Sequence, residues 1–186
     1  TGIALFSELM WMNASSNQLT TIDVSSNINL ETLHVSNNQL TTLDVTSNIN
    51  LWWLSCQNNQ LTSLDTSNNP ALNQLICHSN GITNLDFTQN TSMSYIWCWQ
   101  NLLTSIDVSM LPNLRDLRCG YQPIGVIDVT NNILLEKLHC QSNTLTTLDV
   151  TNNVSLTELD FSSNPLITTI DISNNPLLKY ISGHFT

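Results

Sequence analysis

The sequence predicts a β-rich solenoid of eight coils, each 21 or 22 residues long, with parallel β ladders and little or no α-helix. Three observations support this prediction. The chain repeats itself every 21 residues, each repeat holds two short segments of alternating apolar residues, and no apolar stripe reaches helix length. With 186 residues, of which 41% are hydrophobic and 10% charged, the chain can fill a core and lacks the charge density of a disordered chain.

The cysteines fix the register of the repeat. When Leu30 is numbered position 1, all five fall on position 6 of successive coils, 21 residues apart: Cys56, Cys77, Cys98, Cys119 and Cys140. Coils then begin at residues 9, 30, 51, 72, 93, 114, 135 and 156, and the last contains one extra residue. Residues 9–177 form the eight repeats, residues 1–8 a partial N-terminal coil and residues 178–186 a partial C-terminal coil.

Each coil contains two apolar segments with the patterns LxxLxC and LTxLDV, whose apolar residues occupy positions 1, 4, 6, 11, 14 and 16. Each segment is too short to fold alone. Stacked on identical neighbours about 4.8 Å away, each becomes one rung of a parallel ladder around a continuous core. We therefore expect a strand from both segments.

The segment LETLHVSNNQL (30–40) resembles the LxxLxLxxNxL signature of leucine-rich repeats. The second half of each coil is similar to the 21-residue bacterial type, and the cysteine column resembles the cysteine ladder of an internalin. The resemblance covers residues 9–182. It implies a right-handed leucine-rich-repeat solenoid whose first strands line a concave ligand-binding face. It also implies a secreted or cell-surface setting, although no signal peptide is recognisable in this chain.

Two asparagine columns and the cysteine column have structural explanations. Asn recurs at positions 9 and 19, where turning backbone leaves donors and acceptors inside that a side-chain amide can satisfy. Position 6 also accepts Ala14, Val35 and Phe161, so it favours medium-sized apolar groups, which free cysteine resembles. Thiols in file do not converge as the four ligands of structural zinc do. We expect core packing, no metal and no cofactor.

Position 15 is Asp in all eight coils, and it alternates with inward apolar residues, so these carboxylates point outward in a file. Like charges one rung apart are unfavourable unless each accepts hydrogen bonds or a cation intervenes. The Thr at position 12 and the Ser or Thr at position 17 are the expected donors. Calcium binding stays an alternative, although the glycine-rich calcium-binding repeat is absent.

The composition argues against several function classes. The net charge of −10, with only four Lys and Arg, disfavours nucleic acid, because that affinity depends on cations that neutralise phosphates. No apolar run approaches the ~18 residues that cross a bilayer, so we expect no membrane insertion. No nucleophile and base are paired in the sequence, so we expect no catalytic residues and no enzyme.

The variable positions 2, 3, 5, 7 and 8 carry the functional signal, because they hold every Trp and all four cationic residues. Exposed indoles contribute little to folding and risk aggregation unless a ligand covers them. Trp, Tyr and Arg also dominate interface energetics. The predicted ligand-binding residues are Trp52, Trp53, Ile76, His78, Tyr95, Trp97, Trp99, Arg115, Arg118, Tyr121, Lys137 and His139.

The predicted function is non-enzymatic recognition or adhesion, with a protein as the expected ligand. Aromatic burial, more than long-range charge, should drive binding. Glycan binding is a second hypothesis, because Trp53, Tyr95, Trp97 and Trp99 could stack on sugar rings. An architectural spacer is a third, and ice binding by the Thr file at position 12 is weaker, because the charged Asp file lies nearby.

Two features depart from the regular pattern. Leu111 replaces the second Asn of its coil, and Gln122 replaces the first Asn of the next coil, beside the aromatic and arginine residues. Repeat decay and a reshaped binding loop are both open explanations. Neither end offers a clear polar cap of the kind that solenoids need, so we expect a piece of a longer array or surface protein.

Overall fold

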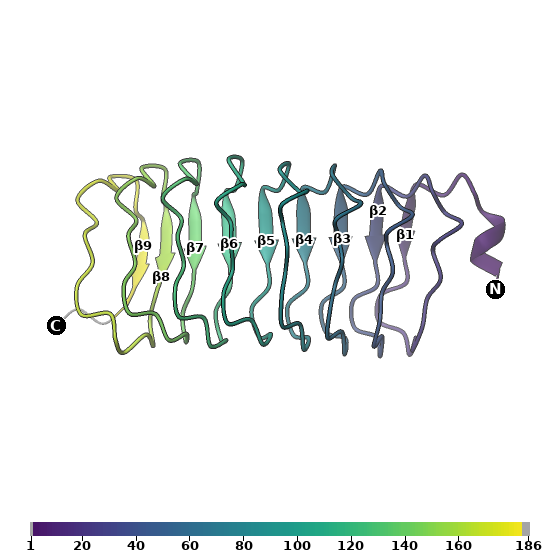
Figure 1. Cartoon of the computed structure of the whole chain (residues 1–186), viewed down its shortest axis with the longest axis horizontal. Coiled ribbons are helices and arrows are strands. Elements are labelled where there is room, and N and C mark those ends of the chain that lie inside the picture. Colours follow the sequence, from purple (N-terminus) through teal and green to yellow (C-terminus); the bar gives the residue numbers. More distant parts are fainter. Residues whose placement is uncertain (1, 184–186) are drawn as a thin grey trace.

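The computed structural model describes residues 2–183, and these form one row of stacked coils (Figure 1). A short 3-10 helix, η1 (Gly2–Leu5), lies at the N-terminal end of the row. Nine three-residue strands follow: β1 (Trp11–Asn13), β2 (Thr32–His34), β3 (Trp53–Ser55), β4 (Gln74–Ile76), β5 (Tyr95–Trp97), β6 (Asp116–Arg118), β7 (Lys137–His139), β8 (Glu158–Asp160) and β9 (Tyr180–Ser182). They form one parallel sheet in chain order. Between residues 2 and 183 there is no α-helix.

Neighbouring strands pair in the register that the cysteines fix. Leu33 of β2 lies opposite Leu54 of β3, and Leu54 lies opposite Leu75 of β4. Between β8 and β9 the extra residue enters the loop after the strand, where Leu166 is 57% exposed and Ile167 is buried. The predicted solenoid of 21- and 22-residue coils is confirmed.

The second apolar segment of the coil does not form a strand, so that expectation was wrong. Its apolar side chains do point inward, as Leu61 and Leu64 show. Its backbone, however, makes few bonds to the preceding coil, such as the one from Gln60 N to Leu40 O at 2.8 Å. Two tight turns follow the segment. Its backbone is extended, but it lacks the continuous ladder of hydrogen bonds that makes a strand.

The cysteines pack in the core as predicted. All five are free and fully buried. Burial raises the pKa of Cys56 to about 12, so its thiol stays neutral and acts as a small apolar group. Phe161 occupies the same column at the C-terminal end, and a Cβ at Gly183 would lie 2.1 Å from its ring. Gly183 therefore makes room for the largest side chain of this column.

The position-9 asparagines join each coil to the one before it. Asn59 Nδ2 donates to Val35 O at 2.9 Å and to Cys56 O at 3.0 Å, while Asn59 Oδ1 accepts from Leu40 N at 3.0 Å. Gln122 forms the same three kinds of bond in its coil. The substitution at Gln122 therefore preserves the repeat, which favours repeat decay over a reshaped loop.

The position-19 asparagines are also structural. Asn48 Nδ2 donates to Val24 O at 3.1 Å and to Asn27 O at 2.8 Å, and the whole residue is buried. Asn27 makes the equivalent bonds to Ile3 O and Phe6 O, so the N-terminal segment takes the place of a preceding coil. The predicted role is confirmed for position 9, whereas most position-19 amides only donate, and the Oδ1 atoms of Asn27 and Asn48, for example, are buried without a partner among the described residues.

Candidate ligand-binding surface

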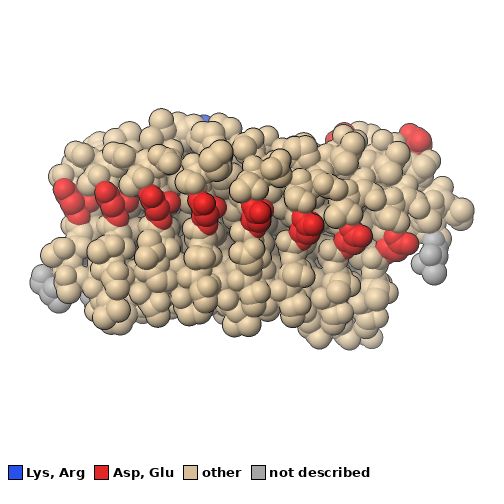
Figure 2. Space-filling view, in the orientation of Figure 1, with Lys and Arg blue, Asp and Glu red and all other residues tan. Residues whose placement is uncertain are grey.

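One side of the solenoid carries the aspartate file and scarcely any Lys or Arg (Figure 2). Each Asp forms a local turn with the residue two positions later: Asp44 Oδ1 accepts from Thr46 N at 2.9 Å and from Thr46 Oγ1 at 2.6 Å. These hydrogen bonds lower the pKa of Asp44 and outweigh the repulsion from neighbouring carboxylates. The donors at position 17 are as predicted.

The expected donors at position 12 are not confirmed. In the coils that begin at residues 9 to 135, within the described part of the chain, no hydrogen bond joins a position-12 Thr to an Asp of the file, since the Asp side chain turns toward position 17 instead. No group of three or more His, Cys, Asp or Glu residues within 2–183 is arranged to hold a metal ion.

The predicted binding residues lie on a different surface, which we call the first-strand surface: the outward side chains of positions 2, 3, 5, 7 and 8. Strands β3 to β7 present Trp53, Ile76, Tyr95, Trp97, Arg118, Lys137 and His139, and the adjoining residues present Trp52, His78, Trp99, Arg115 and Tyr121. Trp52 and Tyr95 are 38% and 37% exposed, whereas Trp53, Trp97 and Trp99 are half-buried. Part of each of these three indoles is therefore packed against neighbouring residues of the surface.

An N-terminal aromatic cluster forms across β1 to β3. The rings of His34 and Trp53 meet edge to face with centroids 4.6 Å apart. Trp52 lies beside Trp53 at 5.9 Å, and Trp11 lies 6.2 Å from His34. Edge and tilted arrangements are those that aromatic pairs prefer. His34 is half-buried here, and desolvation lowers its pKa.

A central aromatic cluster forms across the coils of β4 to β6. The His78 ring stacks on Trp99 at 3.8 Å with an interplanar angle of 11°. Trp97 lies 6.0 Å from Trp99, and the Arg118 guanidinium carbon lies 4.5 Å from the centre of the Trp97 ring. Desolvation lowers the pKa of His78 to about 4, so the stacked imidazole is neutral at pH 7. The rings of both His34 and His78 therefore pack against indoles of the surface.

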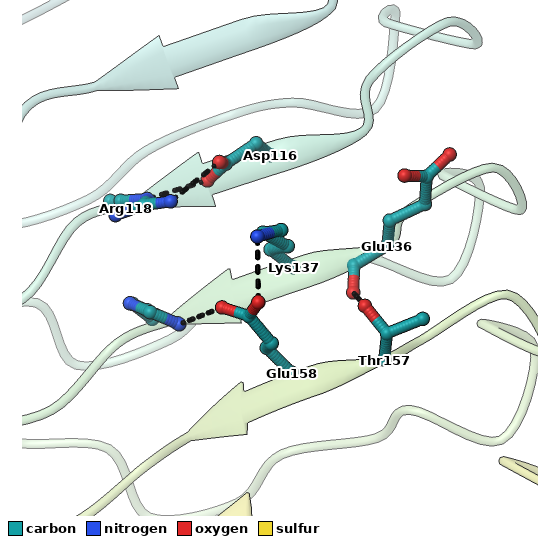
Figure 3. Close-up of polar contacts among 7 residues, drawn as sticks. Asp116, Arg118, Glu136, Lys137, Thr157 and Glu158 are labelled. Carbon is teal, nitrogen blue, oxygen red and sulfur yellow. Dashed lines mark hydrogen bonds and ion pairs between the residues drawn. The ribbon is translucent and has the colours of Figure 1, made fainter. Parts of the chain in front are cut away.

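Three of the four cations of this surface are paired with carboxylates, and Figure 3 shows the pairs of Arg118 with Asp116 and of Lys137 with Glu158. Arg118 Nε and Nη2 each donate to Asp116 at 2.9 Å, and Asp116 is only 4% exposed. Lys137 Nζ donates to Glu158 at 2.6 Å, which lowers the pKa of Glu158, and Arg115 pairs with Glu136. His139 Nε2 lies 3.3 Å from the same Glu158 carboxylate. The surface is therefore aromatic and locally neutral.

A small pocket of about 140 Å³ opens at the C-terminal side of the central cluster. It is lined by Trp99, Arg118, Gly120, Tyr121, His139 and Gln141. Tyr121 has a φ of 59°, the left-handed conformation that position 8 adopts in every complete coil. At this turn the chain leaves the strand, which directs Tyr121 to the rim of the pocket.

Sequence reasoning missed the residues that organise this surface. Asp116, Glu136 and Glu158 hold the cations, and Gly120 and Gln141 shape the pocket. A signal for two pairs was present, because Arg115 and Glu136, like Lys137 and Glu158, are 21 residues apart and therefore adjacent in file. The pocket had no such signal, since it depends on where neighbouring side chains lie.

These features define a leucine-rich-repeat protein with 21-residue repeats and a cysteine ladder. A family model described as Leucine Rich Repeat matches residues 29–49. Among solved structures, the functional domain of InlJ from Listeria monocytogenes, which includes a cysteine ladder, is similar: it is 34% identical with a TM-score of 0.74, over 99% of this chain and 50% of that chain.

Other solved structures share the fold. Internalin C2 of Listeria monocytogenes is 20% identical, with a TM-score of 0.84, over 100% of this chain and 84% of that one. A leucine-rich-repeat protein of Leptospira interrogans is 21% identical, with a TM-score of 0.77, over 96% of this chain and 56% of that one. The chain thus spans about half the length of the InlJ domain it resembles. A comparison with curated protein sequences finds no match. No helix in the described residues is long and apolar enough to cross a membrane.

Proposed function

We propose that this chain recognises a protein partner through its first-strand surface, as a non-enzymatic module in a secreted or cell-surface setting. The observation that supports this proposal is the segregation of Trp, Tyr and Arg side chains on one sheet, while the aspartate file lies apart from them. Leucine-rich-repeat domains commonly mediate protein interactions. Rigid aromatic side chains of this kind supply most of the energy in protein interfaces.

The partner should be bound by apolar and aromatic burial. The cations Arg115, Arg118 and Lys137 already face carboxylates of their own chain, so a partner gains little from opposite charge. Trp52 and Tyr95 remain exposed on either side of β4, whose Ile76 separates the two aromatic clusters. These three residues form the middle of the proposed contact.

A panel of extracellular and cell-surface proteins probed with the purified chain tests the proposal. A specific partner should be bound by the native chain, and the double variant Trp52→Ser/Tyr95→Ser should bind it about 30-fold or more weakly, since loss of interface aromatics commonly costs 2 kcal/mol or more. The control variant Asp65→Asn alters only the aspartate file and should bind as the native chain does. If the double variant still binds and the control variant does not, the partner is bound by the surface of the aspartate file, which contradicts the proposal. Absence of any specific partner would favour the spacer hypothesis.

A further inference from the structure

The pocket beside Trp99 has the volume of a site for a single ring. At about 140 Å³ it is close to the cavity of about 150 Å³ that accommodates one benzene molecule in an engineered protein. Its walls come from three successive coils: Trp99 from the first, Arg118, Gly120 and Tyr121 from the second, and His139 and Gln141 from the third. The repeat spacing therefore sets the width of the pocket.

The pocket continues a ring stack that the chain itself begins. Position 7 of four successive coils holds His78, Trp99, Gly120 and Gln141. His78 stacks on Trp99 at 3.8 Å, and the next residue of the file has no side chain to occupy the following place. A Cβ at Gly120 would lie 2.8 Å from both Gln141 O and Gln141 Oε1. Glycine is therefore needed at this position because the backbone and side chain of Gln141 lie where a Cβ would be.

The far side of the pocket is polar and has unused hydrogen-bonding capacity. Within the described structure the Gln141 side chain forms no hydrogen bond, and its Oε1 is buried without a partner. It can rotate toward a ligand without breaking any existing bond. Arg118 uses Nε and Nη2 for Asp116, which leaves Nη1 as a donor. One wall thus offers an indole face and the other offers both donors and an acceptor.

We propose that this pocket binds one neutral hexose unit of a glycan carried by the partner. This inference rests on the proposed function, since the pocket is part of the first-strand surface. A hexose has an apolar C–H face for Trp99 and hydroxyl groups for Gln141 and Arg118. An aromatic side chain of a protein would fill the volume but would leave these polar groups unpaired, which is costly in a buried site. An acidic sugar gains little, because Asp116 already neutralises Arg118.

Saturation-transfer NMR and tryptophan fluorescence on the full chain test the inference, with glucose, galactose, mannose and N-acetylglucosamine as probes. At least one should bind saturably, with a dissociation constant on the order of millimolar, as expected for so small a ligand. Trp99→Ala should weaken binding about tenfold or more through loss of the stacking face. Asp65→Asn, which alters only the aspartate file and no lining residue of the pocket, should leave hexose binding unchanged.

Gln141→Leu distinguishes a sugar ring from an aromatic ring as the occupant of the pocket, because it removes the Gln141 amide from the polar wall and keeps Trp99. It should weaken hexose binding about tenfold, whereas binding of N-acetyltyrosinamide would be retained or strengthened in an apolar pocket. Absence of saturable hexose binding, or tighter binding of glucuronate or N-acetyltyrosinamide than of any neutral hexose, would overturn the inference. A partner bound equally well after enzymatic deglycosylation would overturn the hexose inference alone and leave the proposed protein recognition intact. Hexose binding without any protein partner would overturn only the proposed protein recognition.

Discussion

The position-9 asparagine shows how a single amide links two coils. Asn59 bonds to Leu40 N, Val35 O and Cys56 O, so it serves the backbone of its own coil and of the preceding one. The two carbonyls also accept from the Asn of a neighbouring coil, but in the structure described the amide of Leu40 has only this acceptor. A truncated side chain therefore leaves at least one inward donor unmet.

We expect Asn59→Ala to destabilise the chain by about 2–3 kcal/mol, because a buried donor loses its partner. Asn59→Gln should cost less than about 1 kcal/mol, since Gln122 already makes the same bonds in another coil. The adjacent Asn58→Gly is the control and should cost little, because the bond that its Nδ2 donates to Asn37 Oδ1 at 2.9 Å is exposed and its left-handed φ of 56° suits glycine. Urea unfolding followed by circular dichroism measures all three. Equal losses in the three variants would contradict this account.

The left-handed residue at position 8 carries a second prediction at this scale. Ser163 has a φ of 55° and is exposed, so its side chain is free to change. Ser163→Asn should raise stability by roughly 0.5 kcal/mol, because Asn tolerates this conformation best among non-glycine residues. Ser163→Val should lower stability by about 1–2 kcal/mol, because a β-branched side chain clashes there. A higher thermal unfolding midpoint for Ser163→Val than for Ser163→Asn would contradict this prediction.

At the scale of the element, the aspartate file is a series of repeated turns. The backbone amide and hydroxyl at position 17 bond to each carboxylate, and they lower the pKa of all eight aspartates despite the neighbouring charges. Because the folded-state pKa lies below the unfolded one, the stabilisation is present above the unfolded value of about 3.9 and is lost as pH falls through the folded value.

The chain should therefore lose some stability as pH falls below about 6.5, because His34 and His78 have lowered pKa values in the folded state, and it should lose more below about 4 as the aspartates of the file become protonated. Thr46→Val/Thr151→Val removes the side-chain donors of two aspartates and should make this acid-induced loss smaller. Thr41→Val/Thr146→Val is the matched control on position 12, where no bond to the file exists, and should follow the native curve. Scanning calorimetry from pH 7 to 2.5 compares the three; identical curves for both double variants would exclude the hydrogen-bond explanation.

The sequence determined strands better than side-chain neighbours. Leucine and cysteine columns fixed β1 to β9 and their register, because a 21-residue spacing leaves only one alignment of buried positions. The prediction of a strand in the second segment was wrong. Leu61 and Leu64 point inward as in a strand, but the backbone of the segment lacks the hydrogen-bond ladder of a strand. The stacking of His78 on Trp99 could not be predicted from the repeat spacing, because it depends on the rotamers of both side chains.

At the scale of the whole molecule, the cysteine ladder reports on the integrity of the stack. All five thiols are fully buried, and burial raises the pKa of Cys98 to about 12. A thiol reagent needs an exposed thiolate, so reaction requires coils to separate. This column therefore converts opening of the solenoid into a chemical signal.

We expect Ellman's reagent to label no thiol of the native chain within minutes at pH 8 and all five in 6 M guanidinium chloride. Asn59→Ala should speed labelling in native buffer, because it weakens the contact between two coils near Cys56. Asn58→Gly is the control and should label as slowly as the native chain. Rapid reaction of even one thiol in the native chain would contradict the buried ladder.

The internal pairing of charges determines how the whole molecule should bind. The chain carries a net charge of −10, yet Arg115, Arg118 and Lys137 of the first-strand surface are paired locally, so screening by salt changes little at the contact itself. We expect affinity for the protein partner to change less than about threefold between 50 and 500 mM NaCl. Asp116→Asn releases the charge of Arg118 and should make binding depend on salt, in a direction set by the charge of the partner. Isothermal titration calorimetry measures both; a strong salt dependence of the native chain would show that charge, and not aromatic burial, drives recognition.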